Sequence, residues 1–139
     1  YNLIYREEER EILPLCADRE MAVVPWSPLA GGRCAHPWGT VTERNKMDDV
    51  SPMVWDATND VDKVVVDNLE KIAREHGRTM AQESLAWMLS KPYITAPIVG
   101  TTSVQHVEEA VAALDIKLDE DEIEALEAPY VPHVKTGAY

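Results

Sequence analysis

The sequence predicts an α/β fold in which parallel strands alternate with helices. Two short apolar runs, residues 21–24 and 94–99, have the length and composition of buried strands, and helix-forming segments follow both. Strand–helix units in this order build a parallel sheet with helices outside it. The chain has 139 residues, 45% of them hydrophobic, so we expect one structural unit over residues 1–139.

The first half of the chain also predicts a helix and a long loop. Residues 6–19 are expected to form a surface helix, because Ile12, Leu15 and Cys16 fall on one face and acidic residues occupy the first turn. Residues 27–59 are interrupted by Pro and Gly and show no sustained period. A loop of this length is a candidate cover for a ligand, with an ordinary surface excursion as the alternative.

The second half of the chain is predicted to be mostly helical. An apolar stripe begins after residue 60 and ends at Gly77, a residue typical of helix C-termini. Two capping boxes, Thr79 with Gln82 and Asp119 with Glu122, open later helices. We expect helices over residues 60–76, 80–90, 104–114 and 120–128, and an irregular tail from residue 129.

The number of strands is small for a parallel sheet. Two strands, with residues 1–5 as a remnant of a third, leave bare edges and an uncovered apolar face. The chain also begins at Tyr1 without an initiating Met. We therefore expect a fragment of a larger closed fold, with exposed sheet edges that favour self-association.

Charge, hydropathy and cysteine spacing argue against several kinds of partner. The formal net charge of −12 disfavours nucleic acid and anionic membrane surfaces, which are bound through clustered Lys and Arg. Apolar runs are far shorter than the roughly 20 residues that span a bilayer, and residues 1–10 lack the features of a signal peptide. We expect a cytoplasmic protein. Cys16 and Cys34 have no metal-binding or redox spacing, so both are expected to be reduced structural residues.

Residues 25–33 have the features of a ligand site at the end of a predicted strand. Trp26 offers a flat face for an aromatic ring, and Ser27 follows with a hydroxyl. Pro28 and the glycines after it form a turn that lets backbone approach a ligand, and Arg33 adds a planar cation for phosphate. The alternative is that Trp26 packs in a core.

Residues 97–103 form a second segment of this kind, because they lead from the other predicted strand directly into a helix. The free N–H groups of a helix N-terminus, and its positive dipole end, favour phosphate. Thr and Ser hydroxyls add donors. The alternative is that Ser103 serves only as the N-cap of the helix.

The two segments belong to a longer pattern. The runs YNLIYREEEREILPLC, VVPWSPLAGG, HPWGT, TMAQESLAWMLSKP and APIVGTTSVQHVEEAVAAL, in this order, resemble the carboxy-terminal portion of the aldo-keto reductases. The tail EDEIEALEAPYVPH fits the same branch, which includes potassium-channel β subunits and many microbial reductases. The resemblance implies an eight-stranded (β/α) TIM barrel, with this chain as about its last three βα units. It also implies reduction of aldehydes and ketones by hydride transfer from NADPH.

The resemblance further implies which residues contact the cofactor. Trp26 would stack on the nicotinamide, the turn after it would line the pyrophosphate, and the second segment would hold the 2′-phosphate and adenine. The implied cofactor-binding residues are Trp26, Ser27, Pro28, Leu29, Ala30, Gly31, Arg33, Gly100, Thr102, His106 and Glu109.

Three positions depart from the family pattern. His106 stands where the family often has Arg or Gln, and Ala110 stands where it often has Asn. A histidine is only partly cationic near pH 7, so NAD(H) stays open beside NADP(H) as the cofactor. Gly31 stands where relatives often carry Arg, for which Arg33 would compensate in part.

The family's catalytic residues are not assigned to this chain. The resemblance implies a Tyr acid tuned by Lys, Asp and His from the first half of the barrel, and none of those motifs occurs here. We therefore expect the isolated chain to be inactive and to supply the cofactor-binding part of a full-length enzyme. The alternatives are a non-catalytic nucleotide-binding or interaction half-barrel that pairs with another chain and, least favoured, a self-contained small domain.

Overall fold

The computed structural model describes residues 1–42 and 58–133, and within these ranges the chain is mostly helical. In chain order the elements are η1 (Glu7–Glu9), α1 (Ile12–Asp18), η2 (Ala30–Gly32), α3 (Asn59–Glu75), α4 (Met80–Leu89), α5 (Val104–Ala112), η5 (Ala113–Asp115) and α6 (Glu120–Glu127). In the described ranges the backbone forms no regular β-strand, and one isolated antiparallel bridge joins Asn2 to Tyr5.

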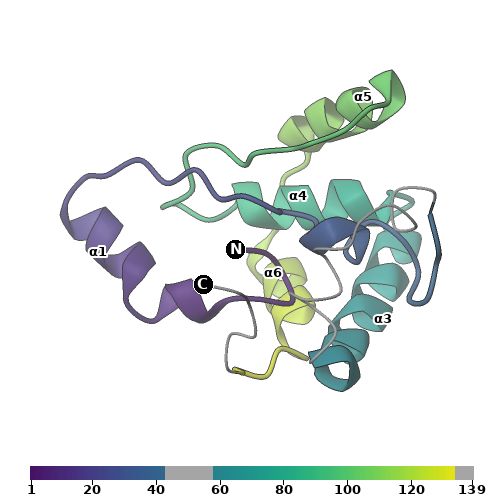
Figure 1. The fold of residues 1–139 in the computed structure, drawn as a ribbon, viewed down its shortest axis with the longest axis horizontal. Coiled ribbons are helices and arrows are strands. Elements are labelled where there is room, and N and C mark those ends of the chain that lie inside the picture. Colours follow the sequence, from purple (N-terminus) through teal and green to yellow (C-terminus); the bar gives the residue numbers. More distant parts are fainter. Residues whose placement is uncertain (43–57, 134–139) are drawn as a thin grey trace.

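Helix α4 lies at the centre of the molecule. It contacts α3 and α5, and α3 also contacts α6, so α5 lies on one side of α4 with α3 and α6 on the other (Figure 1). Trp87 and Met88 of α4 are completely buried. The core around them includes Leu3, Ile4, Leu13, Val66, Leu69 and Leu126. The N-terminal residues therefore pack against helices that come much later in the chain.

The predicted starts of α4 and α6 and the predicted end of α3 are confirmed, whereas the helix predicted over residues 104–114 is divided into α5 and η5. The Thr79 hydroxyl accepts from the Gln82 amide at 3.1 Å and the Gln82 side chain accepts from the Thr79 amide at 3.1 Å, which completes the capping box of α4. Asp119 and Glu122 form the same box at α6, at 2.9 and 2.7 Å. Gly77 follows α3 with a φ of 66°, the left-handed conformation that ends a helix.

The helix predicted over residues 6–19 is divided into η1 and α1. Pro14 explains the break, because inside a continuous helix its ring would clash with the carbonyl four residues earlier, whereas in the first turn of α1 its missing N–H costs nothing. The predicted buried face is corrected as well. Leu13 and Cys16 are buried, whereas Ile12 and Leu15 are half exposed.

The two segments predicted as strands lie side by side without forming regular strands. The Thr95 amide donates to the Val23 carbonyl at 2.9 Å, and the Ile98 amide donates to the Pro25 carbonyl at 2.9 Å, so the pairing is parallel as predicted. A parallel ladder also needs an N–H at residue 25 to donate to the Thr95 carbonyl, and Pro25 has none. The prediction of regular strands is wrong for this reason.

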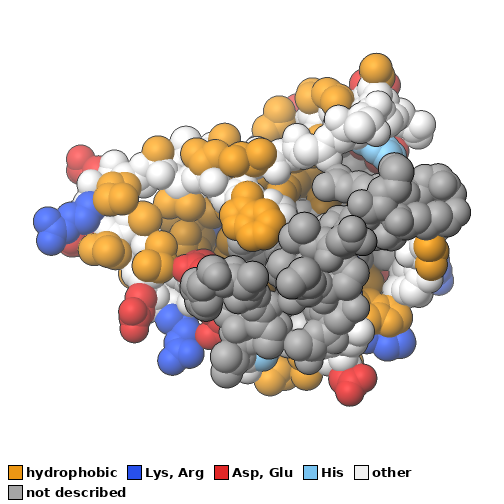
Figure 2. Space-filling model, in the orientation of Figure 1, with side chains coloured by type: hydrophobic (Ala, Val, Ile, Leu, Met, Phe, Trp, Pro, Cys, Tyr) orange, Lys and Arg blue, Asp and Glu red, His pale blue; other side chains and the backbone are white. Residues whose placement is uncertain are grey.

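The prediction that residues 21–24 and 94–99 are buried on both faces is also wrong. Met21, Val24 and Ile98 are each about half exposed. Helix α5 has no buried residue, and Val104 at its start is 76% exposed. Hydrophobic side chains gather along these segments and over α5 (Figure 2). An extensive apolar surface is therefore uncovered in the described part of the chain.

The remaining predictions about the long loop, the cysteines and membranes can be compared with the described residues. Residues 27–42 of the predicted loop contain only the short turn η2, and residues 43–57, part of the candidate cover, lie outside the described ranges. Cys16 and Cys34 are free and buried. Among the described residues no group of side chains could hold a metal ion, and no helix has the length and apolar character to cross a membrane.

Candidate functional site

The two predicted ligand segments lie next to each other because the extended segments that carry them are paired. The hydrogen bond from the Ile98 amide to the Pro25 carbonyl joins the two segments near their first residues. Each segment then leaves the pair in its own direction, the first into η2 and the second into α5. Both segments therefore leave the same end of the paired backbone, where parallel α/β folds hold ligands.

The first segment is a tight turn with an unusual backbone. Ser27 and Ala30 have φ values of 49°, and Gly31 and Gly32 have values of 65° and 100°. The Ala30 amide donates to the Ser27 carbonyl at 3.0 Å, and the Gly32 amide donates to the Leu29 carbonyl at 2.9 Å. A left-handed conformation costs a non-glycine residue roughly 1–2 kcal/mol. Such strain concentrates at functional sites.

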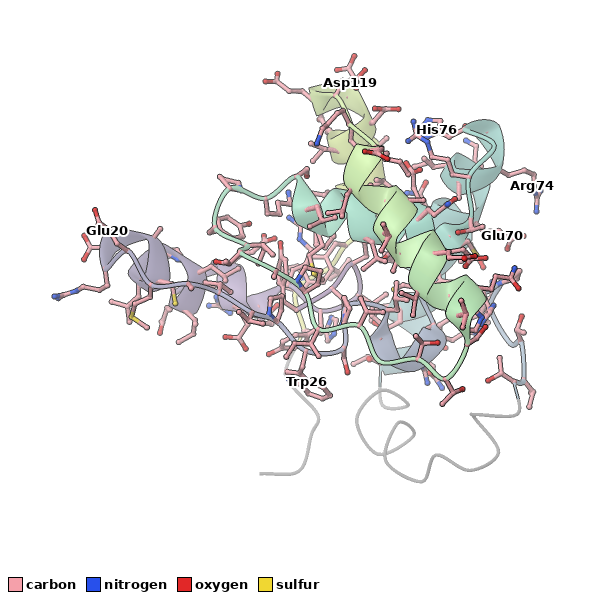
Figure 3. The ribbon with its side chains drawn as sticks, turned by 90° about the horizontal axis from the view of Figure 1, so that it is seen from above. Glu20, Trp26, Glu70, Arg74, His76 and Asp119 are labelled. Atoms are coloured by element: carbon pink, nitrogen blue, oxygen red, sulfur yellow. The ribbon has the colours of Figure 1, made fainter. Side chains whose placement is uncertain are left out.

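Trp26 immediately precedes this turn and is 58% exposed. Its ring projects outward from the extended segment (Figure 3). The core-packing alternative for Trp26 is therefore wrong in this structure, and its ring face is open for stacking.

Arg33 ends the first segment and contacts other protein groups. Its Nη1 donates to Oδ1 of Asn59 at 2.6 Å, and its Cζ lies 5.1 Å from the ring centroid of Trp38. Asn59 is the first residue of α3, so Arg33 connects the turn to that helix. A role for Arg33 in phosphate binding stays a prediction.

The second segment places hydroxyls and a histidine at the start of α5. The Thr101 hydroxyl accepts from the Ser103 amide at 3.1 Å and lies 3.1 Å from Nδ1 of His106. Ser103 occupies the predicted N-cap position, but its side chain makes no capping hydrogen bond. The hydroxyl of Thr101, two residues earlier, accepts from the Ser103 amide, which is a local hydrogen bond typical of Thr.

The other predicted residues of this segment lie on the surface around the helix start. Gly100 and Thr102 are exposed, and Nε2 of Gln105 lies 3.4 Å from Oε1 of Glu109. The structure therefore brings His106 together with Thr101, and Glu109 with Gln105. The first turn of α5 is exposed in the described part of the chain.

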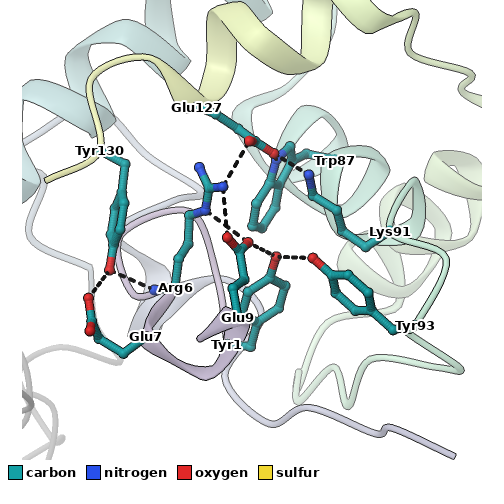
Figure 4. Close-up of polar contacts among 9 residues, drawn as sticks. All are labelled: Tyr1, Arg6, Glu7, Glu9, Trp87, Lys91, Tyr93, Glu127 and Tyr130. Atoms are coloured by element: carbon teal, nitrogen blue, oxygen red, sulfur yellow. Dashed lines mark hydrogen bonds and ion pairs between the residues drawn. The ribbon is translucent and has the colours of Figure 1, made fainter. Parts of the chain in front are cut away.

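A cluster of charged and aromatic residues was not predicted from the sequence (Figure 4). Arg6 binds Glu9 through Nε and Nη2 at 3.0 and 2.9 Å, and binds Glu127 through Nη2 at 2.8 Å. Trp87 donates from Nε1 to Glu127 at 2.8 Å, and Lys91 donates to the same carboxylate. We call Arg6, Glu9, Trp87, Lys91 and Glu127 the Arg6 cluster. It joins the N-terminal segment to α4 and α6.

The ionisation of this region is set by its hydrogen bonds. Burial alone would raise the pKa of Glu127, but the bonds from Lys91 and Trp87 outweigh burial and lower it. Burial and the hydrogen bond to Glu9 raise the pKa of Tyr1, which therefore keeps its proton. Because its charges are paired, the cluster has the character of a structural brace and not of a reactive site.

A sequence model of the aldo/keto reductase family matches residues 1–130. The chain belongs to this family. It is 42% identical over 134 residues to a versiconal hemiacetal acetate reductase of Aspergillus parasiticus, covering 95% of this chain and 39% of that protein. It is 38% identical over 138 residues to an aldo-keto reductase of Fusarium vanettenii, covering 99% of this chain and 37% of that protein. The chain thus spans less than two fifths of the length of these relatives.

The fold agrees with this membership. A crystal structure of a thermostable aldo-keto reductase in complex with the inhibitor epalrestat superposes on 93% of this chain and 37% of its own, with a TM-score of 0.61 and 30% identity. The chain therefore has a fold like part of a TIM barrel. In such barrels the strands are covered on both faces, whereas here the paired segments are exposed.

Proposed function

We propose that this chain forms the nucleotide-binding part of an aldo-keto reductase, an oxidoreductase that reduces aldehydes and ketones with NADPH. The observation that carries the proposal is the pairing of the two segments through Ile98 and Pro25, which puts an exposed Trp26 and the residues that lead into α5 at the same end of the paired backbone. Membership of the family supports the cofactor class. The chain contributes about the last three βα units of the barrel.

The first segment would hold the nicotinamide end of the cofactor. Trp26 stacks on the nicotinamide ring, because its face is exposed directly before the turn. Ser27, Leu29 and Ala30 line the pyrophosphate, with Pro28 shaping the turn, and positive φ values bring backbone close to a ligand. Bound NADPH supplies a hydride to the carbonyl carbon.

The second segment would hold the adenine end. The N–H groups at the start of α5 and the Thr102 hydroxyl face the 2′-phosphate, and Gly100 permits close approach. His106, held by Thr101, adds a cation only when it is protonated, so NAD(H) is the alternative cofactor. Glu109 accepts from the adenine amine.

In this proposal the chain's own residues bind and orient the cofactor, and a group outside this chain protonates the product. Tyr1 and Tyr93 lie beside the Arg6 cluster, where burial raises the pKa of each. Burial also raises the pKa of Tyr130, which donates to Glu7. We assign the acid to a part of the barrel outside this chain and expect no turnover from the chain alone. We place the reaction in the cytoplasm.

A second candidate function is a non-catalytic half-barrel that pairs with another chain. The exposed apolar residues Val104, Val107 and Val111 of α5 favour it, because an uncovered apolar helix face promotes association. Light scattering after size-exclusion chromatography tests this candidate. A defined oligomer with weak nucleotide affinity and no activity supports it, whereas a folded monomer counts against it.

Calorimetric titration of the 139-residue chain with NADPH and NADH tests the first proposal. Trp26→Ala is expected to weaken NADPH binding about tenfold, in line with the loss of one aromatic stacking contact. Val24→Ala is the matched control, since it truncates an equally exposed apolar side chain on the same segment. The proposal fails if a chain shown by circular dichroism to be folded does not bind NADPH, or if both variants bind equally well.

A further inference from the structure

Asn2 is a completely buried polar residue whose side chain reaches the first ligand segment. Its Nδ2 donates to the Ser27 carbonyl at 3.0 Å, and its Oδ1 accepts from the Ile4 amide at 3.1 Å. Its backbone pairs with Tyr5 in both directions, at 3.0 and 3.1 Å. The neighbours Leu3 and Ile4 are buried in the core. Asn2 is therefore a rigid donor, fixed by a local turn that the core anchors.

Asn2 contacts Ser27, one of the two non-glycine residues of the turn that have a positive φ. Ser27 has a φ of 49° and precedes Pro28, a position where sterics already restrict the backbone. Its carbonyl also accepts from the Ala30 amide at 3.0 Å. Two donors on one carbonyl fix the orientation of the peptide plane between Ser27 and Pro28. Loss of the Asn2 donor would leave a single bond to oppose the strain.

We propose that Asn2 is a positioning residue that holds the turn from Ser27 to Ala30 in its cofactor-binding shape. This inference rests on the proposed nucleotide site. Asn2 touches neither the cofactor nor the reacting atoms, and it acts through the Ser27 carbonyl. Without it, Ser27 relaxes toward negative φ, which displaces Trp26 on one side and Ala30 on the other.

Asn2→Asp distinguishes a role of Asn2 in holding Ser27 from a role in stabilising only its own turn with Ile4. An aspartate keeps an oxygen that accepts from the Ile4 amide but has no N–H to donate to Ser27. Asn68→Asp, at a half-buried position, is the control for loss of the hydrogen bond, because Nδ2 of Asn68 also donates to a carbonyl, that of Ala125, at 2.8 Å between α3 and α6. Both variants lose one amide-to-carbonyl bond, and only Asn2→Asp is expected to affect the turn.

The two halves of the cofactor site give the binding readout. Asn2→Asp is expected to raise the Kd for NADPH about tenfold, the effect of one lost buried hydrogen bond. The Kd for adenosine 2′,5′-bisphosphate, which contacts only the second segment, is expected to change less than about twofold. Asn68→Asp is expected to change neither. Equal weakening of both ligands by Asn2→Asp, or of neither, overturns the proposal.

Hydrogen exchange gives a readout without any ligand. Faster exchange of the Ala30 and Gly32 amides is expected in Asn2→Asp and not in Asn68→Asp, because these amides close the turn. Unchanged exchange overturns the proposal. If the wild-type chain binds neither ligand, the proposed function fails, and exchange alone still decides whether Asn2 holds the turn.

Ser27→Gly keeps the proposal testable if a buried carboxylate at position 2 prevents folding. Glycine adopts positive φ without strain, so the turn in this variant needs no second donor. Asn2→Ala in the Ser27→Gly background is therefore expected to speed exchange of the Ala30 amide less than Asn2→Ala does in the wild-type background. Equal effects in both backgrounds overturn strain at Ser27 as the reason for the contact.

Discussion

The Arg6 cluster and the turn at residues 27–32 use polar groups in opposite ways. In the cluster, Arg6 pairs with Glu9 and Glu127 at 2.8–3.0 Å, and Glu127 accepts from Arg6, Lys91 and Trp87 together. In the turn, two non-glycine residues adopt positive φ, and Trp26 beside it is exposed. One region satisfies its polar groups to hold helices together. The turn has a strained backbone next to an exposed aromatic ring, and backbone strain is typical of functional sites.

The largest expected effect comes from breaking the cluster. Glu127→Ala removes an acceptor shared by Arg6, Lys91 and Trp87 and is expected to lower the free energy of unfolding by about 3 kcal/mol, because Lys91 and the Trp87 N–H lose their acceptor and Arg6 keeps only Glu9. Urea denaturation measures this. Glu124→Ala, on the exposed side of α6, is the control and is expected to change stability by less than about 0.5 kcal/mol. A decrease in the free energy of unfolding of less than about 1 kcal/mol for Glu127→Ala would contradict a stabilising role of the Arg6 cluster.

Acidification is expected to weaken the same region. Hydrogen bonds outweigh burial and lower the pKa of Glu127 and of Glu7 below the ordinary value of 4.5. Their stabilisation is complete above the unfolded-state pKa and is lost as the pH falls through the folded-state pKa. Burial raises the pKa of Asp62, which acts in the opposite direction. The difference in the pH dependence of stability between wild type and Glu127→Gln isolates the contribution of the Glu127 carboxylate.

The measurement for this prediction is urea denaturation at pH 7 and at several pH values below the ordinary pKa of 4.5 for a glutamate. The wild-type chain is expected to lose more stability over this range than Glu127→Gln does, since the variant has no carboxylate to protonate at this position. Parallel curves for the two proteins would show that Glu127 is not stabilised as an anion by its partners.

Two helix ends test the cost of positive φ away from the turn. Gly77 has a φ of 66° after α3, and Glu20 has a φ of 52° after α1 (Figure 3 labels Glu20). Gly77→Ala is expected to destabilise the chain by about 1 kcal/mol and Glu20→Gly to stabilise it by about the same amount. An added Cβ at Gly77 meets no atom within 4 Å, so backbone strain alone is measured. Midpoints of thermal unfolding that shift in the same direction for Gly77→Ala and Glu20→Gly would contradict a cost of positive φ at these positions.

The smallest expected effect concerns Cys34 at the end of the turn. Its amide donates to the Leu29 carbonyl at 3.2 Å, and burial with the nearby Asp62 charge raises the pKa of its thiol to about 12. Because only the thiolate reacts, modification by a disulfide reagent at about pH 8 is expected to be negligible in the folded chain and complete in urea. Mass spectrometry locates the label. Rapid modification of Cys34 without urea would show that the turn opens, and Asn2→Asp is expected to speed it.

The features predicted correctly are those whose signals are local. The capping boxes at Thr79 and Asp119 and the stop at Gly77 each involve residues within one helical turn, so sequence spacing is sufficient. The prediction of regular strands fails because Pro25 removes a donor that only the pairing partner makes necessary. The prediction of one long helix fails at Pro14, although the signal of a proline is local too.

The sequence by itself determined the helices, the family and the two segments that carry ligand-binding residues. The tertiary structure decided that Ile98 pairs with Pro25, that Asn2 contacts Ser27 and that Arg6 contacts Glu127. Arg6 and Glu127 lie 121 residues apart, and no periodicity connects residues at such a distance. A hydrogen bond between distant segments depends on how the core places both of them, and that placement is set by packing and not by local propensity.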